Sequence, residues 1–318
     1  MKRTVYLGLL LIAPILLFAL VRGGIGLASH QLESQYPPPG QMIRVNGHRL
    51  HLYCTGRGTP TVVIEPGMGT DWVSWRSVSL KLAEVTRVCV YDRAGYGWSD
   101  AGPRPRTAGR IATELHALLT NAEIGGPYIL VAHSFGGYVA RIYASRFPES
   151  VNGVVLVDPS SEEGNGASAA SVAARIVNAD ILSLVPPLGW QRLKRLYQGD
   201  AALPAGMRDL PAAYRNRVLV GSSIVQLKSE RNEFDSLSLS EAEVRAAPFP
   251  RDLRLTVLTA ARGMTAAHRE QHEKLARLST LGKQVFAENS GHSIQLDQPE
   301  LILDAVRELM ELHTSSQK

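Results

Sequence analysis

The sequence predicts an α/β fold: a mainly parallel β-sheet covered by helices, with a helical segment inserted into it. Three observations lead to this prediction. Short β-branched runs alternate with helical stretches along most of the chain, these runs are apolar almost throughout, and residues 160–250 contain no strand pattern. Strands that are apolar at nearly every position are buried on both faces of a parallel sheet.

Composition agrees with a large folded domain. The chain has 318 residues, of which 45% are hydrophobic and 20% are charged, which is enough to bury a sizeable core. The net charge of +5 is modest, and Lys2, Arg3 and Arg22 flank one apolar segment instead of forming a basic stripe. We therefore expect no nucleic-acid partner.

The first element is the uncharged apolar run Thr4–Val21, which follows Lys2 and Arg3. It is long enough to span a membrane as one helix. A cleaved signal peptide is the alternative, with small residues preceding a possible cleavage point before Ser29. Because the positive charges come first, both interpretations carry the rest of the chain out of the cytoplasm. Residues 1–40 are thus interpreted as a membrane anchor or signal peptide with a proline-rich linker.

The core elements follow in order. "MIRVNG" and "RLHLYCTG" predict an antiparallel hairpin. "TVVIEPG" and "RVCVYDRAGYG" predict two strands with a helix between them, and "YILVAHS" and "GVVLVDPS" repeat this pattern around the helix "YVARIYASRF". The strands "LRLTVLTA" and "KQVFAE" and a helix from about Pro299 to Leu312 complete the chain. The predicted core comprises residues 41–159 and 251–318.

Residues 160–250 form the predicted insertion. They are rich in alanine and leucine and are interrupted by prolines at positions 186, 187, 204 and 211. A long insertion between core strands is seldom structureless, and such segments often cover a binding site. We interpret the insertion as a helical cap whose aliphatic side chains would form an apolar pocket.

The stretch "LVAHSFGG" places Ser134 directly after a buried strand and directly before a helix. This is the strand–turn–helix setting of a nucleophile elbow. So sharp a turn brings backbone atoms together, and the residues two before and two after the serine, Ala132 and Gly136, are accordingly small. An ordinary helix cap is the alternative role for Ser134. His133 is interpreted as part of the turn or its packing.

Three further segments favour a nucleophile. "SGHSIQLDQPE" places His292 between the last strand and the last helix, "EPGMG" ends an early strand in a turn whose amides can face a substrate oxygen, and Asp158 ends the strand after the elbow. The chain order Ser134, Asp158, His292 is that of nucleophile, acid and base. In such a group the imidazole removes the serine proton and the carboxylate fixes the imidazole tautomer.

With "AHSFGG", "DRAGYGWSD" and "SGHSIQLDQPE" in this order around the predicted cap, the chain resembles the α/β-hydrolase family over roughly residues 42–312. The resemblance implies an eight-stranded sheet with Ser134 as nucleophile and His292 as general base. It also implies an oxyanion hole formed by the backbone N–H groups of Met68 and Phe135.

The chain departs from the family pattern at two places. Pro66–Gly67 stands where relatives often have His-Gly, which leaves the Met68 amide available. Many relatives carry the catalytic acid after the strand "LRLTVLTAARG", and here no carboxylate follows it until Glu270. Asp158, a position that some members use, is therefore the expected acid, and a purely structural strand-end role for it stays open. The alternative acids are Glu162, Glu163 and Glu270.

The resemblance predicts a serine hydrolase that cleaves a small-molecule ester, thioester or amide through an acyl-enzyme, and in particular a carboxylesterase for a small or medium hydrophobic acyl group. Serine at the elbow argues against the dehalogenase and epoxide-hydrolase branches, which use aspartate. A proline-type aminopeptidase and a ligand-binding module without turnover are the alternatives. We expect no cofactor. Substrate identity and oligomeric state do not follow from the sequence.

Two residue pairs have both a structural and a chemical interpretation. His268 and His272 lie one helical turn apart, but "HREQH" lacks the glutamate placement of "HExxH" and shows no third ligand. We interpret them as a solvated helix face and expect no metal. Cys54 and Cys89 lie in strands that the α/β-hydrolase fold places side by side. They form a disulfide if the domain faces an oxidising compartment, or else two buried thiols.

Overall fold

The computed structural model describes residues 37–163, 197–203, 211, 214–215 and 224–316. Residues 38–174, 205–207 and 222–318 form one compact unit, which contains the sheet, and residues 1–37, 175–204 and 208–221 form another. The predicted anchor or signal segment Thr4–Val21 and much of the predicted cap lie outside the described residues. Among the helices that are described, none is long and apolar enough to cross a membrane.

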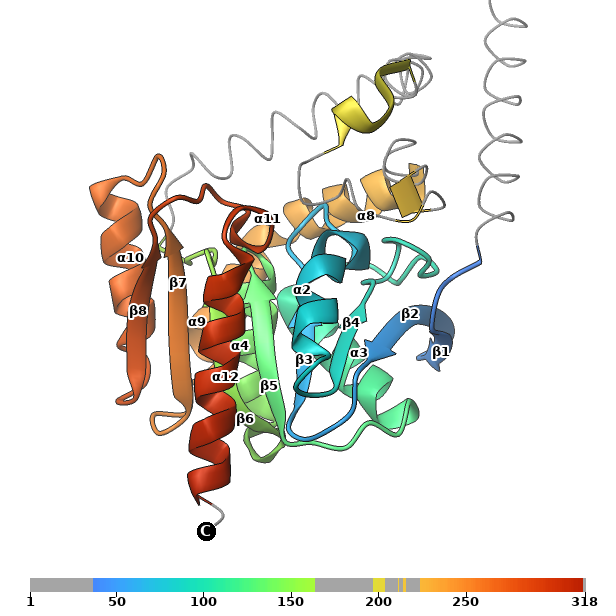
Figure 1. Ribbon diagram of the computed structural model, residues 1–318. Helices are drawn as coiled ribbons and strands as arrows, with labels where there is room; N and C mark the ends of the chain where they lie inside the picture. The colour runs from blue at the N-terminus through green and yellow to red at the C-terminus, as the bar shows by residue number, and fades with distance from the viewer. Residues whose placement is uncertain (1–36, 164–196, 204–210, 212–213, 216–223, 317–318) are drawn as a thin grey trace, which may run out of the picture. The chain divides into compact units, whose positions relative to one another are not determined.

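An eight-stranded sheet forms the centre of the larger unit (Figure 1). Its strands are β1 (Gln41–Val45), β2 (His48–Thr55), β3 (Thr61–Glu65), β4 (Val88–Tyr91), β5 (Tyr128–His133), β6 (Val151–Val157), β7 (Arg254–Ala260) and β8 (Gly282–Ala287). Their spatial order is β1-β2-β4-β3-β5-β6-β7-β8. β2 pairs antiparallel with β1 and β4, and the remaining pairs are parallel. The predicted mainly parallel sheet with an antiparallel start is confirmed.

Helices cover both faces of this sheet. The helices in the described part of the chain are α2 (Arg76–Leu82), α3 (Ala108–Asn121), α4 (Gly136–Arg146), α8 (Ile224–Asp235), α9 (Leu237–Ala246), α10 (Ala266–Ala276), α11 (Ile294–Asp297) and α12 (Pro299–Ser316), with short 3₁₀ helices at Trp72–Trp75, Pro148–Ser150 and Gly199–Ala202. In Figure 1, α2 and α12 lie in front of the sheet, while α3, α4 and α9 lie behind it. Two-sided covering explains why β3, β4 and β5 are buried along their whole length.

Local sequence signals set several boundaries. The hairpin turn between β1 and β2 uses Asn46 and Gly47, both with positive φ, as the twist of a tight hairpin requires. α3 begins after Thr107 and α10 after Thr265, and each threonine hydroxyl accepts a hydrogen bond from a free amide of the first turn. Within the described part of residues 160–250, α8 and α9 are helices, and α9 packs against α3 and α4. That this segment forms a cap over a site stays a prediction.

Strand register brings the candidate site together. β5 and β6 pair His133 with Val157, so the next residues, Ser134 and Asp158, leave the sheet side by side. The Ser134 amide donates to the Val157 carbonyl at 3.1 Å, and the Asp158 amide donates to the Leu258 carbonyl of β7 at 2.8 Å. Parallel strands that end at the same edge thus place three loops next to one another.

A disulfide joins β2 to β4. Their register places Cys54 opposite Cys89, with the Cα atoms 4.1 Å apart, and the two residues are bonded. The sequence left a disulfide and two free thiols open, because it does not contain the Cα separation.

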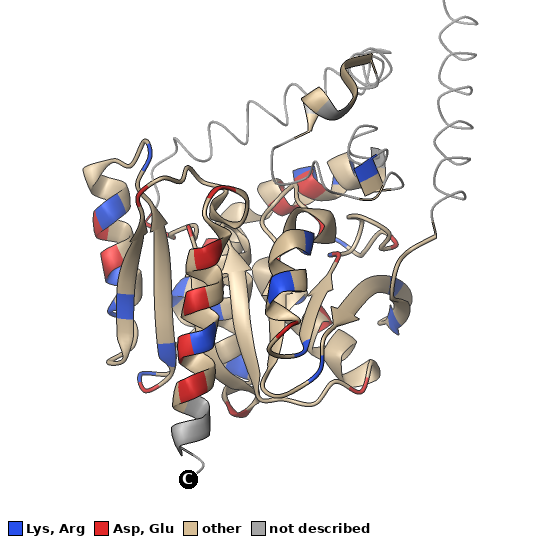
Figure 2. Cartoon of the chain, in the orientation of Figure 1, with Lys and Arg blue, Asp and Glu red and all other residues tan. Residues whose placement is uncertain are grey.

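Charged side chains are mixed on the helices of the outer layers. Figure 2 shows acidic and basic residues following one another along α10, and mainly acidic residues along α12. Several form ion pairs, among them Lys274 with Glu270 and Lys283 with Glu308. α10 therefore carries both signs of charge, whereas the charged residues of α12 are acidic except for Arg307.

Candidate active site

Ser134 lies in a strained turn between β5 and α4. Its φ of +52° is in the left-handed region, which non-glycine residues rarely adopt outside constrained sites. The turn is crowded, since a Cβ on Gly136 would lie 2.7 Å from the Glu65 carbonyl oxygen. A small residue is therefore required two positions after the serine, as the sequence predicts for a nucleophile elbow.

Asp158 and His292 form a hydrogen-bonded pair beside this turn. His292 Nδ1 lies 2.6 Å from Asp158 Oδ2, and the carboxylate also accepts from the Ala260 amide at 3.0 Å. Burial of Asp158 disfavours its charge, but the hydrogen bonds from His268 and His292 outweigh this effect and hold the pKa of the carboxyl well below its usual range. An ionised Asp158 accepts the Nδ1 proton of His292, which leaves Nε2 with the lone pair that a general base needs.

The hydroxyl of Ser134 is not joined to this pair in the structure. Among the described residues, no hydrogen bond connects Ser134 Oγ with His292. The side chain of His292 is 58% exposed, and the loop that carries it lies between β8 and α11. The structure thus places Asp158 and His292 in direct contact. Ser134 lies at the same edge of the sheet, because it follows the strand that pairs with β6.

His133 contacts His292 through a hydrogen bond and through its ring. Its Nε2 donates to the His292 carbonyl at 2.9 Å, and the two rings lie 4.7 Å apart. The pKa of His133 is lowered to about 3, mainly by burial and to a smaller extent by the nearby His292, so the ring stays neutral. The ring also leaves no room for a side chain at position 67, because a Cβ on Gly67 would lie 2.6 Å from His133 Nδ1.

The turn after β3 is held in one orientation. The Gly67 carbonyl accepts hydrogen bonds from Arg93 Nη2 at 2.9 Å and from Thr70 Oγ1 at 2.9 Å. Within a trans peptide the N–H points away from the carbonyl, so these bonds also fix the direction of the Met68 N–H. Within the described residues, the backbone amides of Met68 and Phe135 donate no hydrogen bond. One of these amides thus lies in the turn after β3, whose Gly67 is next to Ser134, and the other lies directly after Ser134.

Arg93 belongs to a buried charge cluster that the sequence did not reveal. Its guanidinium lies 2.8 Å from Glu65 Oε1 and 2.9 Å from Glu233 Oε1, while Tyr96 donates to Glu233 at 2.8 Å and Tyr91 donates to Glu65. Burial raises the pKa of Glu65 to about 7, with Arg93 and Tyr91 opposing it. The "DRAGYG" motif signals a tight loop here. It does not indicate that Glu233 of α8 contacts that loop.

His268 and His272 are placed differently from the prediction. His272 is 1% exposed, with Nε2 2.9 Å from the Pro159 carbonyl and Nδ1 3.0 Å from Thr259 Oγ1. His268 Nε2 lies 3.0 Å from Asp158 Oδ1. The interpretation as a solvated helix face was wrong, because α10 packs against β7 and β8 and turns these histidines inward.

The alternative acids have other partners. Glu162 makes two hydrogen bonds to Arg141, at 2.6 and 2.8 Å. Glu163 and Glu270 both pair with Lys274, at 2.8 and 3.3 Å. In the described part of the chain, none of these three carboxylates hydrogen-bonds to His292.

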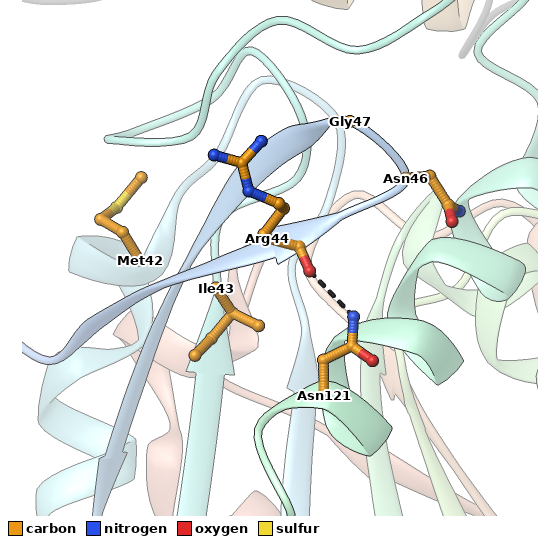
Figure 3. Close-up of a pocket in the computed structure, with 6 residues that line it drawn as sticks. All are labelled: Met42, Ile43, Arg44, Asn46, Gly47 and Asn121. Carbon is orange, nitrogen blue, oxygen red and sulfur yellow. Dashed lines mark hydrogen bonds between the residues drawn. The ribbon is translucent and has the colours of Figure 1, made fainter.

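A surface hollow lies away from these residues (Figure 3). It is lined by Met42, Ile43, Arg44, Asn46, Gly47 and Asn121. These residues come from the β1–β2 hairpin and the end of α3, and the Asn121 amide donates to the Arg44 carbonyl. The hollow contains none of the predicted site residues.

Known proteins with related sequences differ in length. A protein of the "AB hydrolase superfamily" from Gibberella zeae is 25% identical over 80% of this chain and 87% of its own length. An uncharacterised protein from Schizosaccharomyces pombe is 26% identical over 86% of this chain, which spans only 56% of that relative.

Structural comparison gives the same fold. An esterase from Exiguobacterium antarcticum superposes with a TM-score of 0.66 over 86% of this chain and 99% of its own, at 17% sequence identity. The model of the alpha/beta hydrolase family matches residues 62–305, which run from β3 into α12 and include the elbow, Asp158 and His292. On this match, and on the sheet order described above, the chain belongs to the α/β-hydrolase family.

Proposed function

We propose that this chain is a serine hydrolase that cleaves a small-molecule ester through an acyl-enzyme, as a carboxylesterase does. The observation that carries the proposal is the Asp158–His292 hydrogen bond at the sheet edge where the strained Ser134 turn also lies. The turn after β3 adds a fixed amide next to that serine. The groups to which the proposal gives the roles of nucleophile, base, acid and oxyanion donor thus come from loops at one edge of the sheet, which supports the proposal.

The proposed reaction assigns each group one task. His292 Nε2 removes the Ser134 proton as Oγ attacks the carbonyl carbon, and Asp158 stabilises the resulting imidazolium. The Met68 and Phe135 amides stabilise the oxyanion. His292 then protonates the departing alcohol, and water hydrolyses the acyl-enzyme by the same steps. Serine and imidazole need to approach each other, which is common because catalytic hydrogen bonds often tighten only in the substrate complex.

The chemistry of the nucleophile limits the substrate class. A serine ester intermediate suits esters, thioesters and amides with a small or medium hydrophobic acyl group. A proline-type aminopeptidase is the second enzymatic candidate, and a ligand-binding module without turnover is the non-enzymatic one. The ionised Asp158 and its hydrogen bond to His292 favour turnover over binding alone.

The proposal extends to location. We propose that Thr4–Val21 anchors the chain in a membrane or directs its export, with the catalytic domain outside the cytoplasm. The Cys54–Cys89 disulfide supports this placement, because disulfides persist in oxidising compartments.

Active-site labelling tests the nucleophile. A fluorophosphonate probe should label the purified full-length chain, and Ser134→Ala should abolish both labelling and ester hydrolysis. Ser150→Ala, at the opposite end of β6, is the matched control and should label normally. An unlabelled wild type, or equal labelling of Ser134→Ala, would exclude Ser134 as nucleophile.

A substrate panel distinguishes the three candidate functions. It contains acyl esters of increasing chain length, the corresponding amides and aminoacyl substrates. Ester turnover supports the carboxylesterase, turnover of substrates with N-terminal proline supports the aminopeptidase, and stoichiometric acylation without turnover supports the binding module.

A further inference from the structure

Behind the Asp158–His292 pair lies a second group of ligating atoms. One nitrogen each of His268 and His272 and one oxygen of Asp158 all lie within 4.8 Å of one another. His268 Nε2 is 3.0 Å and His272 Nδ1 is 4.0 Å from Asp158 Oδ1. The sequence shows only the histidine pair on α10, and the fold adds the carboxylate at the end of β6. We propose that these three residues form a binding site for a divalent transition-metal ion, with Zn²⁺ as the best fit.

The spacing agrees with tetrahedral coordination. Ligand atoms at ~2.0–2.1 Å from a zinc ion lie about 3.3 Å apart. The separations of 3.0 and 4.0 Å to Asp158 Oδ1 bracket this value, so small side-chain rotations suffice. Two imidazole nitrogens and one carboxylate oxygen suit Zn²⁺, Co²⁺, Ni²⁺ and Cu²⁺, whereas Mg²⁺ and Ca²⁺ prefer oxygen alone.

The surroundings of His272 orient it as a ligand. Its Nε2 donates to the Pro159 carbonyl at 2.9 Å, the kind of contact that fixes the tautomer of metal-binding histidines. This leaves Nδ1 with its lone pair on the side of Asp158. The Thr259 hydroxyl, which donates to Nδ1, also accepts from Gln284 at 2.9 Å and can rotate away.

His268 provides access to the site. Its side chain is 34% exposed, so an ion can enter from solvent and keep a water molecule as fourth ligand. Binding displaces the proton shared by His268 Nε2 and Asp158 Oδ1, because a metal ligand needs a deprotonated nitrogen.

Occupation of the site opposes the proposed hydrolysis, and this step rests on the proposed function. Asp158 would share its charge with a dication at Oδ1 while Oδ2 faces His292. A carboxylate held by a metal stabilises an imidazolium less well, so His292 becomes a weaker base. The site would therefore act as an inhibitory metal switch located behind the acid.

Titration calorimetry with Zn²⁺ and with Mg²⁺ tests binding on the full-length, chelator-treated chain without a polyhistidine tag. One equivalent of Zn²⁺ should bind, and Mg²⁺ should not. His268→Gln should weaken Zn²⁺ binding roughly 100-fold or more, with unchanged melting in metal-free buffer because the residue is partly exposed. His116→Gln on α3 is the matched histidine control and should bind like the wild type.

Three results would overturn the proposed metal site. They are no Zn²⁺ binding by the wild type, unchanged Zn²⁺ binding in His268→Gln, and an equal loss of Zn²⁺ binding in His116→Gln. Ser134→Ala should bind Zn²⁺ normally.

Zn²⁺ should inhibit ester hydrolysis with a midpoint equal to its dissociation constant. Hydrolysis that persists in the Zn²⁺-bound protein would overturn the inhibitory switch. A chain that binds Zn²⁺ through His268 but hydrolyses no ester keeps the site and refutes only the proposed function.

Discussion

At the residue scale, one buried carboxylate organises the candidate site. Asp158 directs one oxygen to His292 and the other to His268, and its own φ of +40° lies in the left-handed region. Such a conformation is kept only where the surroundings constrain it. Here the constraint includes the hydrogen bond from the Asp158 amide to the Leu258 carbonyl of β7.

Replacement of Asp158 by asparagine should lower turnover about 10⁴-fold, because the imidazole would lose the partner that fixes its tautomer. The protein should remain folded, since the amide keeps the shape of the carboxyl group. Steady-state kinetics and a melting curve measure the two effects. The controls are Glu162→Gln, Glu163→Gln and Glu270→Gln. Near-normal turnover in Asp158→Asn, with collapse in one control, would move the acid to that residue.

A second residue-scale prediction concerns His133 and pH. The pKa of this ring is about 3 in the folded chain and ordinarily near 6.5, so the unfolded chain takes up a proton first as pH falls. The contribution of the neutral His133 ring to the free energy of unfolding is therefore complete above pH ~6.5 and is lost as the pH falls towards ~3.

The stability advantage of the wild type over His133→Gln should therefore shrink by up to about 1 kcal/mol per pH unit between pH ~6 and pH ~4. Urea denaturation of both proteins across this range measures it. A constant difference would show that the ring does not stay neutral when folded.

At the element scale, α8 is tied to the turn after β3. Glu233 of α8 holds Arg93, which in turn donates to the carbonyls of Pro66 and Gly67. The same guanidinium therefore connects a helix of the inserted segment with the proposed oxyanion donor. A shift of α8 would be transmitted to the Met68 amide through Arg93.

Arg93→Lys should lower kcat by roughly 10²–10³-fold with little change in KM, the effect of losing one oxyanion donor. The ammonium group of lysine cannot make the several hydrogen bonds that the planar guanidinium of Arg93 makes at once. Arg106→Lys is the control, because Arg106 is equally buried and makes two hydrogen bonds to Glu114 away from the site. Similar melting but a selective loss of kcat in Arg93→Lys supports the role, and equal kinetics in both variants would refute it.

At the scale of the whole molecule, the sheet and the disulfide bear on where the protein works. Cys54 and Cys89 connect the antiparallel start of the sheet to its parallel centre. The apolar run Thr4–Val21 precedes this domain and follows two positive residues. Together these features favour export of the domain across a membrane.

A reporter fused after Lys318 should be active only outside the cytoplasm, and protease added to intact cells or spheroplasts should digest the domain. The reason is the positive charge at Lys2 and Arg3, which stays inside. Moving Lys2 and Arg3 to the far side of the apolar run gives a control that should reduce export. Full protection together with a cytoplasmic reporter signal would contradict the proposed topology.

Much of the fold could be predicted from local patterns. The strands around Ser134 and the loop that carries His292 follow from apolar runs and turn residues that are adjacent in the chain, and such signals act over a few residues. Asp158 was the expected acid mainly because the strand "LRLTVLTAARG" lacks one. The hydrogen bond from His292 to Asp158 agrees with that choice.

The sequence by itself determined the alternation of strands and helices, the sharp turn at Ser134 and the chain order of the candidate groups, because each depends on neighbouring residues. Only the tertiary structure decided which distant groups meet. Arg93 contacts Glu233 across 140 residues, and Asp158 contacts His268 across 110. These contacts depend on how α8 and α10 pack, and the periodicity of a helix specifies its buried face but not the partner that covers it. For this reason the inward orientation of His272, the Cys54–Cys89 bond and the approach of His268 and His272 to Asp158 are evident only in the folded chain.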